Sequence, residues 1–290
     1  MYSEATHFNS KYSVSVVIPS LGGRCLYKTI ESLNSGNFKP DEILISLPSK
    51  EHVDKIKIKE NNVKLVNTNC YGQVSQRLEG FKQAKYNFVI QMDDDIELGI
   101  DTLERMIQLL IELGPGNAIG PSFFDPISKE TLHKFDLGLV GFLKSLNAYI
   151  FSGSSWGLSR MGKITKIGVS YGVDANFFKE DVCEVEWLPG GCVLNYKQDL
   201  ILEDYFPYSG KAFSEDIIHS IMRSSKNIKH YVAFQTMAIT DLDEKNFNWK
   251  DFKSEFHSKL YIIKLLGGNK IRLGIWGISQ FLIRQITWKK

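Results

Sequence analysis

The stretch "YNFVIQMDDDIEL", residues 86–98, decides how this chain is interpreted. The apolar run from Tyr86 to Met92 predicts a buried strand, and three carboxylates, Asp93, Asp94 and Asp95, follow it directly. Neighbouring carboxylates raise the cost of ionising one another, and no basic residue close by in the sequence offsets that cost. Turns favour aspartate, but one usually suffices. Two interpretations follow: a solvated acidic turn, or a site for a cation.

The flanking sequence alternates between two periodicities. Strand-like runs lie at 14–18, 41–47, 63–68 and 86–92, with a short strand and turn at 116–124, and helical spacing marks 26–35, 72–85 and 101–113. Strands alternating with helices predict a mostly parallel sheet with crossover helices. Ligands of such sheets bind at the carboxyl ends of the strands. The position of the three aspartates therefore favours the cation interpretation.

Beyond residue 124 the pattern weakens. Residues 125–182 are rich in Gly, Ser and aromatic residues, which predicts long loops and short strands that form a substrate-facing wall. Regular periodicity returns at 184–200, in a helix at 214–225, and in strands at 229–234 and 237–241.

Composition is that of a globular protein: 290 residues, 43% hydrophobic and 23% charged. The net charge of +2 gives no global basic surface, so we expect no nucleic-acid partner. Residues 256–290 carry seven Lys or Arg and no acid, which leaves the rest of the chain with 28 basic and 33 acidic residues. This distribution indicates an anionic partner for the tail.

The four cysteines show no CxxC spacing, which favours reduced thiols in a cytoplasmic protein over a disulfide framework or a metal knuckle. The polar N-terminus does not resemble a signal peptide, and no apolar run approaches the ~20 residues that span a bilayer. We therefore expect a cytoplasmic protein that is soluble or lies on a membrane surface without crossing it.

Two motifs carry candidate chemistry. The spacing Asp93-x-Asp95 lets two carboxylates share Mn²⁺ or Mg²⁺, which would neutralise a diphosphate leaving group as a Lewis acid. In "FSEDIIHS", Glu215 and Asp216 open a helix, where acids also stabilise the helix dipole. The functional alternative is a carboxylate aimed into a cleft to deprotonate a hydroxyl.

These motifs, taken in order with "SVSVVIPSLGG", "DEILIS" and "WLPGGCVLNYKQDL", resemble the family-2 glycosyltransferases of the GT-A fold over residues 13–240. The resemblance implies a GT-A-like α/β fold with a mostly parallel central sheet flanked by helices. It also implies an inverting, metal-dependent hexosyltransferase. The donor would be a UDP- or dTDP-sugar and the acceptor a saccharide, free or linked to polyprenol, in surface polysaccharide or glycan assembly.

The resemblance also implies residue roles. Asp216, with Glu215 beside it, is the expected general base, and a single displacement at the anomeric carbon inverts its configuration. The remaining roles are nucleotide binding by Pro19, Ser20, Arg77, Asp93 and Asp94, metal binding by Asp93, Asp95 and Asp241, and contact with the sugars by Trp187, Gly190 and Gly191. The two glycines would let the backbone approach a ligand closely, or simply form a tight turn.

The sequence departs from the family pattern at two places. After the second strand the chain reads "ISLPSKE", without the aspartate that reads the base, so the base contact and a uridine donor stay open. Where many members carry a histidine near the metal, "MAITDLDE" offers Asp241, either as a substitute ligand or as a surface acid.

The resemblance divides the chain into an N-terminal tail (1–12), a catalytic domain (13–245) and a basic C-terminal extension (246–290). Within the domain, 13–120 is the expected nucleotide-binding half and 121–245 the acceptor half. The extension mixes apolar, aromatic and basic residues, which suits an anionic membrane surface at the inner face of the cell membrane or a helix packed on the domain.

Two rival functions stay open. "SLGGRCLYK" after the first strand loosely resembles the phosphate loop of a sugar-phosphate nucleotidylyltransferase, although the Glu215–Asp216 pair has no task there. A non-catalytic saccharide-binding relative would suit the altered end of the second strand. The sequence does not indicate which sugar moves or which linkage forms.

Overall fold

The computed structural model describes residues 12–208, 212–240 and 249–287. Its strands are β1 (Val14–Pro19), β2 (Glu42–Leu47), β3 (Val63–Asn67), β4 (Phe88–Met92), β5 (Ile96–Leu98), β6 (Asn117–Phe124), β7 (Val182–Val185), β8 (Cys192–Tyr196) and β9 (Lys229–Thr240). Its α-helices are α2 (Cys25–Ser35), α3 (Lys50–Lys55), α4 (Gln73–Gln83), α5 (Thr102–Leu113), α6 (Gly138–Asn147), α7 (Glu215–Ser225), α8 (Trp249–Leu266) and α9 (Lys270–Thr287).

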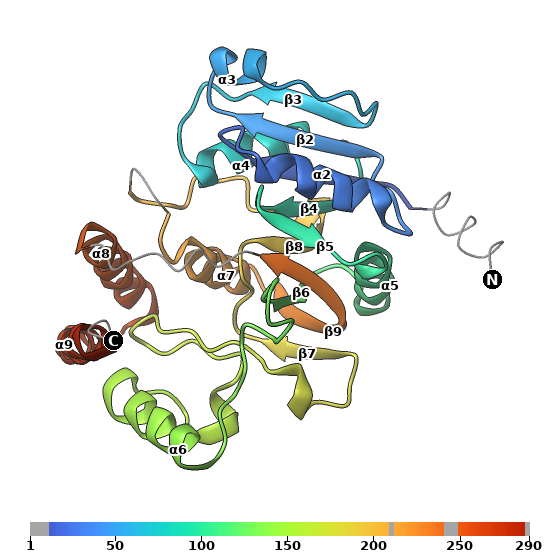
Figure 1. Ribbon diagram of the computed structural model, residues 1–290. Coiled ribbons are helices and arrows are strands. Elements are labelled where there is room, and N and C mark those ends of the chain that lie inside the picture. Colours follow the sequence, from blue (N-terminus) through green and yellow to red (C-terminus); the bar gives the residue numbers. More distant parts are fainter. Residues whose placement is uncertain (1–11, 209–211, 241–248, 288–290) are drawn as a thin grey trace.

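The strands form one sheet in the order β3-β2-β1-β4-β8-β6-β9-β5, with β7 on β9 (Figure 1). Strands β3, β2, β1 and β4 are parallel to one another, and every residue of β1, β2 and β4 is buried. Burial of both faces explains why these strands are continuous apolar runs. The order reverses between β1 and β4, and the crevice at their carboxyl ends is where such sheets bind ligands.

Helix α4 lies directly on this parallel part of the sheet. A Cβ added at Gly80 would come within 2.3 Å of Val17 Cγ1 and 2.5 Å of the Ser46 hydroxyl, so no larger residue fits there. The close approach brings the first turns of α4 to the carboxyl ends of β1 and β4. Its polar residues Gln73, Gln76 and Arg77 therefore reach the sheet edge.

The expected α/β fold with a central sheet flanked by helices is confirmed, and beyond β4 the sheet is mixed, with β6 and β9 parallel to each other. Strand β8 runs antiparallel to β4 and β6, and β5 and β7 run antiparallel to β9. The two strands predicted at 229–234 and 237–241 are a single strand, β9, whose pairing with β6 shifts register between Pro121 and Ser122. The predicted division at residue 120 falls inside β6, so both halves share one sheet.

The prediction of loops and short strands for residues 125–182 was wrong at α6. This helix is followed by the short helical segments η1 (Ala148–Ser152), η2 (Gly157–Arg160) and η3 (Ala175–Phe177). The residues that α6 buries are the small ones, Gly141 and Ser145. Because its large apolar side chains do not mark the inner face, the usual amphipathic pattern is absent from the sequence.

The C-terminal extension is helical, as predicted, and packs on the domain. Ile262 of α8 joins a core cluster with Trp187 and Ile217, while Leu273 and Trp276 of α9 pack with Ile167. The boundary predicted at residue 246 lies outside the described residues. None of the helices in the described part of the chain combines the length and apolar character needed to cross a bilayer.

Candidate active site

The carboxyl ends of β1 and β4 are tied together by Asp94. The Ser20 hydroxyl donates a hydrogen bond to the Asp94 carboxylate, and the Thr29 hydroxyl of α2 donates to the Asp94 carbonyl oxygen at 3.0 Å. Ser20 and the preceding Pro19 are buried. These three predicted nucleotide-binding residues therefore lie together at the sheet edge, where they fix the positions of the strand ends.

Asp93 is held from two sides. Gln73 Nε2 and Arg77 Nη2 donate to its Oδ1 at 2.7 and 3.2 Å, and its backbone N–H donates to the Gly191 carbonyl at 2.8 Å. A Cβ added at Gly191 would lie 3.7 Å from Asp93 Oδ2, which places that oxygen on the Gly191 side. Burial raises the pKa of Asp93 to about 6, since the attraction of Arg77 offsets only part of the desolvation.

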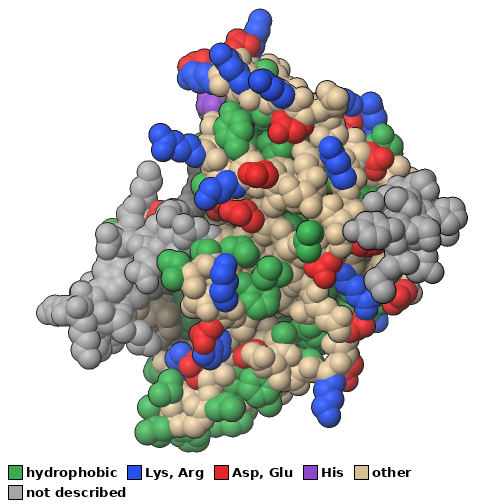
Figure 2. All heavy atoms as spheres, turned by 45° about the vertical axis from the view of Figure 1, so that its right-hand side comes forward, with side chains coloured by type: hydrophobic (Ala, Val, Ile, Leu, Met, Phe, Trp, Pro, Cys, Tyr) green, Lys and Arg blue, Asp and Glu red, His purple; other side chains and the backbone are tan. Residues whose placement is uncertain are grey.

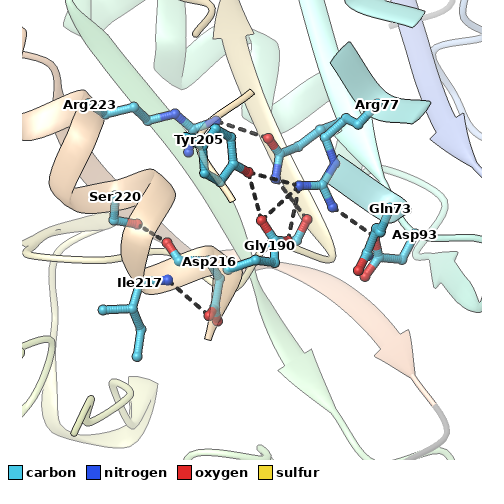
Figure 3. Close-up of polar contacts among 11 residues, drawn as sticks. Gln73, Arg77, Asp93, Gly190, Tyr205, Asp216, Ile217, Ser220 and Arg223 are labelled. Atoms are coloured by element: carbon cyan, nitrogen blue, oxygen red, sulfur yellow. Dashed lines mark hydrogen bonds and ion pairs between the residues drawn. The ribbon is translucent and has the colours of Figure 1, made fainter. Parts of the chain in front are cut away.

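Arg77 joins the sheet edge to α7 (Figure 3). Its side chain is 1% exposed, and Nη1 donates to both carboxylate oxygens of Glu215, at 3.0 and 3.1 Å. The Tyr205 hydroxyl donates to Glu215 Oε2 at 2.7 Å. Burial lowers the pKa of Arg77, but Glu215, Tyr205 and Asp93 outweigh it and raise that pKa above its ordinary value. Arg77 thus lies behind the site as a charged clamp between Asp93 and Glu215.

Asp216 stands beside this clamp and lines the cleft. Its Oδ1 accepts a hydrogen bond from the Ile217 backbone N–H at 2.9 Å. Burial, followed by repulsion from Glu215, raises the pKa of Asp216 to about 7. A carboxylate that titrates near neutral pH is well matched to accept and release protons. Ser214 at the N-cap position makes no side-chain cap bond, so it does not cap the helix that Glu215 and Asp216 open.

The loop between β7 and β8 is fixed by a buried polar network. Gln91 Nε2 of β4 donates to the Gly190 carbonyl at 2.8 Å, and Arg223 Nη2 of α7 donates to Gln91 Oε1 at 3.0 Å (Figure 3). A Cβ at Gly190 would come within 2.5 Å of Glu215 Oε1. Gly190 therefore allows the start of α7 to approach the loop closely.

Trp187 belongs to the same loop between β7 and β8. Its Nε1 donates to the Tyr171 carbonyl at 3.0 Å, and its ring meets His133 edge-on with centroids 6.1 Å apart. Trp187 and His133 both line an open cleft of about 450 Å³. The predicted residues that the structure brings together around this cleft are Asp93, Asp95, Trp187, Gly190, Gly191, Glu215 and Asp216.

Sequence reasoning missed several residues of the site. Gln73 lies one helical turn before Arg77, so the i, i+4 spacing on α4 could have indicated it. Tyr205 and His133 lie outside the regular helices and strands, and no periodic signal marks them. Asp241, predicted as a metal ligand, lies outside the described residues.

The donor set at the sheet edge fits a hard divalent cation. Asp93 and the exposed Asp95 both line the cleft. Among the described residues there is no group of three or more His, Cys, Asp or Glu that could hold a metal. Mg²⁺ typically takes one or two protein carboxylates and completes its shell with phosphate oxygens and water, and Mn²⁺ also suits carboxylate oxygens. Two carboxylates beside a cleft meet that requirement.

A sequence model described as Glycosyl transferase family 2 matches residues 15–160, half of the chain. The chain belongs to glycosyl transferase family 2. Its match spans the sheet edge, Arg77 and the three aspartates, whereas α7 lies beyond it. No match was found among curated proteins.

Solved structures with the GT-A fold resemble this family member. GalNAc-T7 with UDP, GalNAc and Mn²⁺ is 15% identical with a TM-score of 0.57, and the match covers 82% of this chain and 45% of that one. S. aureus TarS 1–349 in complex with UDP-GlcNAc is 16% identical with a TM-score of 0.51, covering 95% and 73%. A longer S. aureus TarS structure is 14% identical with a TM-score of 0.50, covering 94% and 43%. This chain spans less than half of GalNAc-T7 and of the longer TarS structure, and the likeness establishes the fold.

Proposed function

We propose that this chain transfers a sugar, with inversion, from a nucleoside-diphosphate donor to a hydroxyl of a saccharide acceptor. The observation that carries the proposal is the placement of three carboxylates at two positions on one cleft: Asp93 and Asp95 at the sheet edge, and Asp216 at the start of α7. One position suits a leaving diphosphate, and the other suits an attacking hydroxyl.

On the donor side, Asp93 and Asp95 would hold Mn²⁺ or Mg²⁺, and a bound cation supplies the positive charge that stabilises a departing diphosphate. The chain's own residues prepare this position. Gln73 and Arg77 orient the Asp93 carboxylate, while Ser20 and Asp94 hold the strand ends in register.

On the acceptor side, a carboxylate oxygen of Asp216 takes the proton of the acceptor hydroxyl as that oxygen attacks the anomeric carbon. The task falls to Asp216 because the Glu215 carboxylate is engaged by Arg77 and Tyr205. A single displacement from the face opposite the leaving group inverts the anomeric configuration. Trp187, Gly190 and Gly191 shape the wall against which the sugars lie.

We infer a UDP-sugar as the first donor to test, since structures of the same fold contain UDP or UDP-GlcNAc. A dTDP-sugar is the second, because Leu47 and Pro48 lie at the end of β2, where the family pattern has a base-reading aspartate. The acceptor would be a saccharide, free or polyprenol-linked, in glycan assembly at the cytoplasmic face of a membrane. The basic C-terminal extension would contact anionic lipid there.

Family membership favours glycosyl transfer over the nucleotidylyltransferase alternative, in which Asp216 has no task. An experiment distinguishes a transferase from a non-catalytic saccharide-binding relative. Asp216→Asn should abolish turnover in a transferase and keep nucleotide binding, whereas a binding module should be unaffected.

The proposed donor chemistry is tested by the thermal shift that a panel of nucleoside diphosphates causes, with and without Mn²⁺. A ligand that binds only the folded state raises the melting temperature by mass action. We expect one nucleotide to raise it, with a larger rise when Mn²⁺ is present. No rise with any nucleotide would overturn the proposal.

A further inference from the structure

Helix α6 exposes the residues that a helix normally buries. Leu139, Phe142 and Leu143 are 74%, 52% and 54% exposed, while Gly141 and Ser145 face inward. Figure 2 shows hydrophobic side chains gathered at the lower end of the molecule, where Figure 1 places α6. Burial of such side chains is worth about 25 cal/mol per Å² of apolar area, so this inverted arrangement gives up stability in water. Contiguous apolar patches of this kind mark contact surfaces.

A second exposed apolar face lies on α9. Ile271, Ile275 and Ile278 follow helical spacing and are 74%, 49% and 64% exposed, although Leu273 and Trp276 of the same helix are buried. The segment η1 connects α6 to α9, because Phe151 of η1 packs in the core cluster that contains Leu273 and Trp276. Both apolar faces therefore belong to elements that pack through η1.

The charge of this part identifies what it contacts. Residues 137–173 contain four Lys or Arg and no Asp or Glu, and residues 256–290 contain seven and none. Elsewhere the chain holds 24 basic and 33 acidic residues. Within the first segment Lys144 and Lys163 form ion pairs with Asp136 and Glu186, which lie outside it. Lys166, Lys264, Lys270 and Arg272 are exposed. Basic charge around apolar side chains complements an anionic lipid surface.

Aromatic side chains add a further feature of membrane interfaces. Trp156 is 45% exposed and meets Tyr149 and Phe142 edge-on, with centroids 5.9 and 5.5 Å apart. Tyr and Trp side chains prefer the headgroup level, where an apolar ring and a polar tip are both satisfied. Phe142 belongs to α6, and the exposed Tyr149 and Trp156 follow this helix in the sequence.

We propose that α6, η1 and the outer face of α9 form a docking surface that inserts into the interface of an anionic phospholipid membrane. The surface supports the function proposed above, on which its biological purpose rests. His133 lines the cleft, and Leu137, four residues later, adjoins α6. An extended chain covers ~3.5 Å per residue, so the backbone positions of His133 at the cleft and Leu137 beside α6 are at most about 14 Å apart. A lipid-linked acceptor reaching the cleft from this surface is consistent with that distance.

The test is flotation of the full-length protein with vesicles of phosphatidylcholine alone or mixed equally with phosphatidylglycerol. The protein should float with the anionic vesicles, and high salt should weaken binding because it screens the basic charges. Leu139→Gln/Leu143→Gln should reduce partitioning at least about tenfold, since two leucines no longer enter the apolar layer. Ile100→Gln, at a 66% exposed isoleucine just before α5, is the matched control and should float like the wild type.

Three results would overturn the proposal: equal binding of the double variant and the wild type, equal binding to both vesicle types, or a dimer in lipid-free solution that the double variant dissociates. In the last case the surface would be covered by a second copy. The nucleotide-induced thermal shift, measured on the same variants, should be unchanged. Its absence from the wild type would refute the proposed function and leave the flotation result standing.

Discussion

The two walls of the cleft, the sheet edge and the start of α7, position their acidic side chains in a similar way but with different residues. At the sheet edge, Asp93 and Asp94 are held by side chains from α4 and by Ser20, and Asp95 follows on the exposed turn. At the start of α7, Glu215 is held by Arg77 and Tyr205, and Asp216 follows at the cleft. On each wall the acids that neighbouring side chains hold are followed directly in the sequence by an acid at the cleft.

Arg77 links the two walls of the cleft. It is buried between Asp93 and Glu215, residues that lie 122 positions apart in the sequence, and it contacts both. The comparison shows that neighbouring acidic residues are tolerated when the buried guanidinium of Arg77 neutralises the acids it contacts, Asp93 and Glu215. The acids that follow them in the sequence, Asp95 and Asp216, then line the cleft.

Asp216→Asn should have the largest effect on turnover. Removing a general base typically costs 10²–10⁴-fold, and we expect a loss of about 10³-fold or more in nucleoside-diphosphate release from the donor sugar. Glu215→Gln is the companion variant. If it reduced turnover as much as Asp216→Asn without loss of stability, the assignment of different roles to Glu215 and Asp216 would be wrong.

The same Asp216→Asn variant should be more stable than the wild type at pH 8. The folded state raises the pKa of Asp216 from 3.8 to about 7, so it binds that proton more tightly than the unfolded chain does. Stability linked to this group therefore falls as the pH rises from about 4 to 7. Asparagine carries no buried charge, and we expect a gain on the order of 1–2 kcal/mol at pH 8 and little at pH 4, measured by urea unfolding.

Arg77→Met should destabilise the fold by about 3–5 kcal/mol, because it leaves Glu215 and Asp93 without their buried cation. Lys82→Met, on the same helix at a side chain that is 49% exposed, should change stability by no more than about 0.5 kcal/mol. Glu215→Gln added to Arg77→Met should restore part of the loss. Equal urea midpoints for Arg77→Met and Lys82→Met would show that the clamp does not hold the two walls together.

The pH dependence of kcat/KM gives a separate test of Asp216 as the base. With the pKa of Asp216 near 7, its base form declines below that pH, and kcat/KM should fall about 50-fold between pH 7 and pH 5, approaching tenfold per pH unit at the acid end. Above pH 8 the profile should be level with respect to this group. A wild-type rate that stays constant from pH 5 to 8 would argue against Asp216 as the base.

Gly190→Ala should destabilise the fold less than Arg77→Met does. The new methyl group would stand 2.5 Å from Glu215 Oε1, and such overpacking typically costs about 1–3 kcal/mol. Gly191→Ala is the control, since its Cβ would meet nothing closer than 3.3 Å and should cost less. Equal unfolding free energies for the two variants would show that the loop does not press on Glu215.

The sequence predicts the sheet-edge wall better than the facing wall for a physical reason. Strands β1, β2 and β4 are buried on both faces and α4 and α5 are amphipathic, so local periodicity reports their positions. The aspartate turn follows directly from the end of β4. The family resemblance then assigns roles to residues that lie on known elements.

The rest depends on contacts that local patterns do not encode. The Arg77–Glu215 pair joins positions 138 apart, and Tyr205 reaches it from an irregular segment. Helix α6 escapes prediction because it exposes Leu139 and Leu143 and buries Gly141, the reverse of the pattern by which a surface helix is recognised. Contacts between distant residues, and a helix whose large side chains face outward, are thus the features that periodicity conceals.

The most direct test of the two-wall account measures nucleotide binding in two variants side by side. The thermal shift caused by the selected nucleoside diphosphate with Mn²⁺ would be compared in wild type, Asp95→Ala and Asp216→Asn. We predict that Asp95→Ala loses the Mn²⁺-dependent part of the shift and that Asp216→Asn keeps all of it. A full shift in Asp95→Ala, or a lost shift in Asp216→Asn, would contradict the assignment of the donor to one wall and the acceptor to the other.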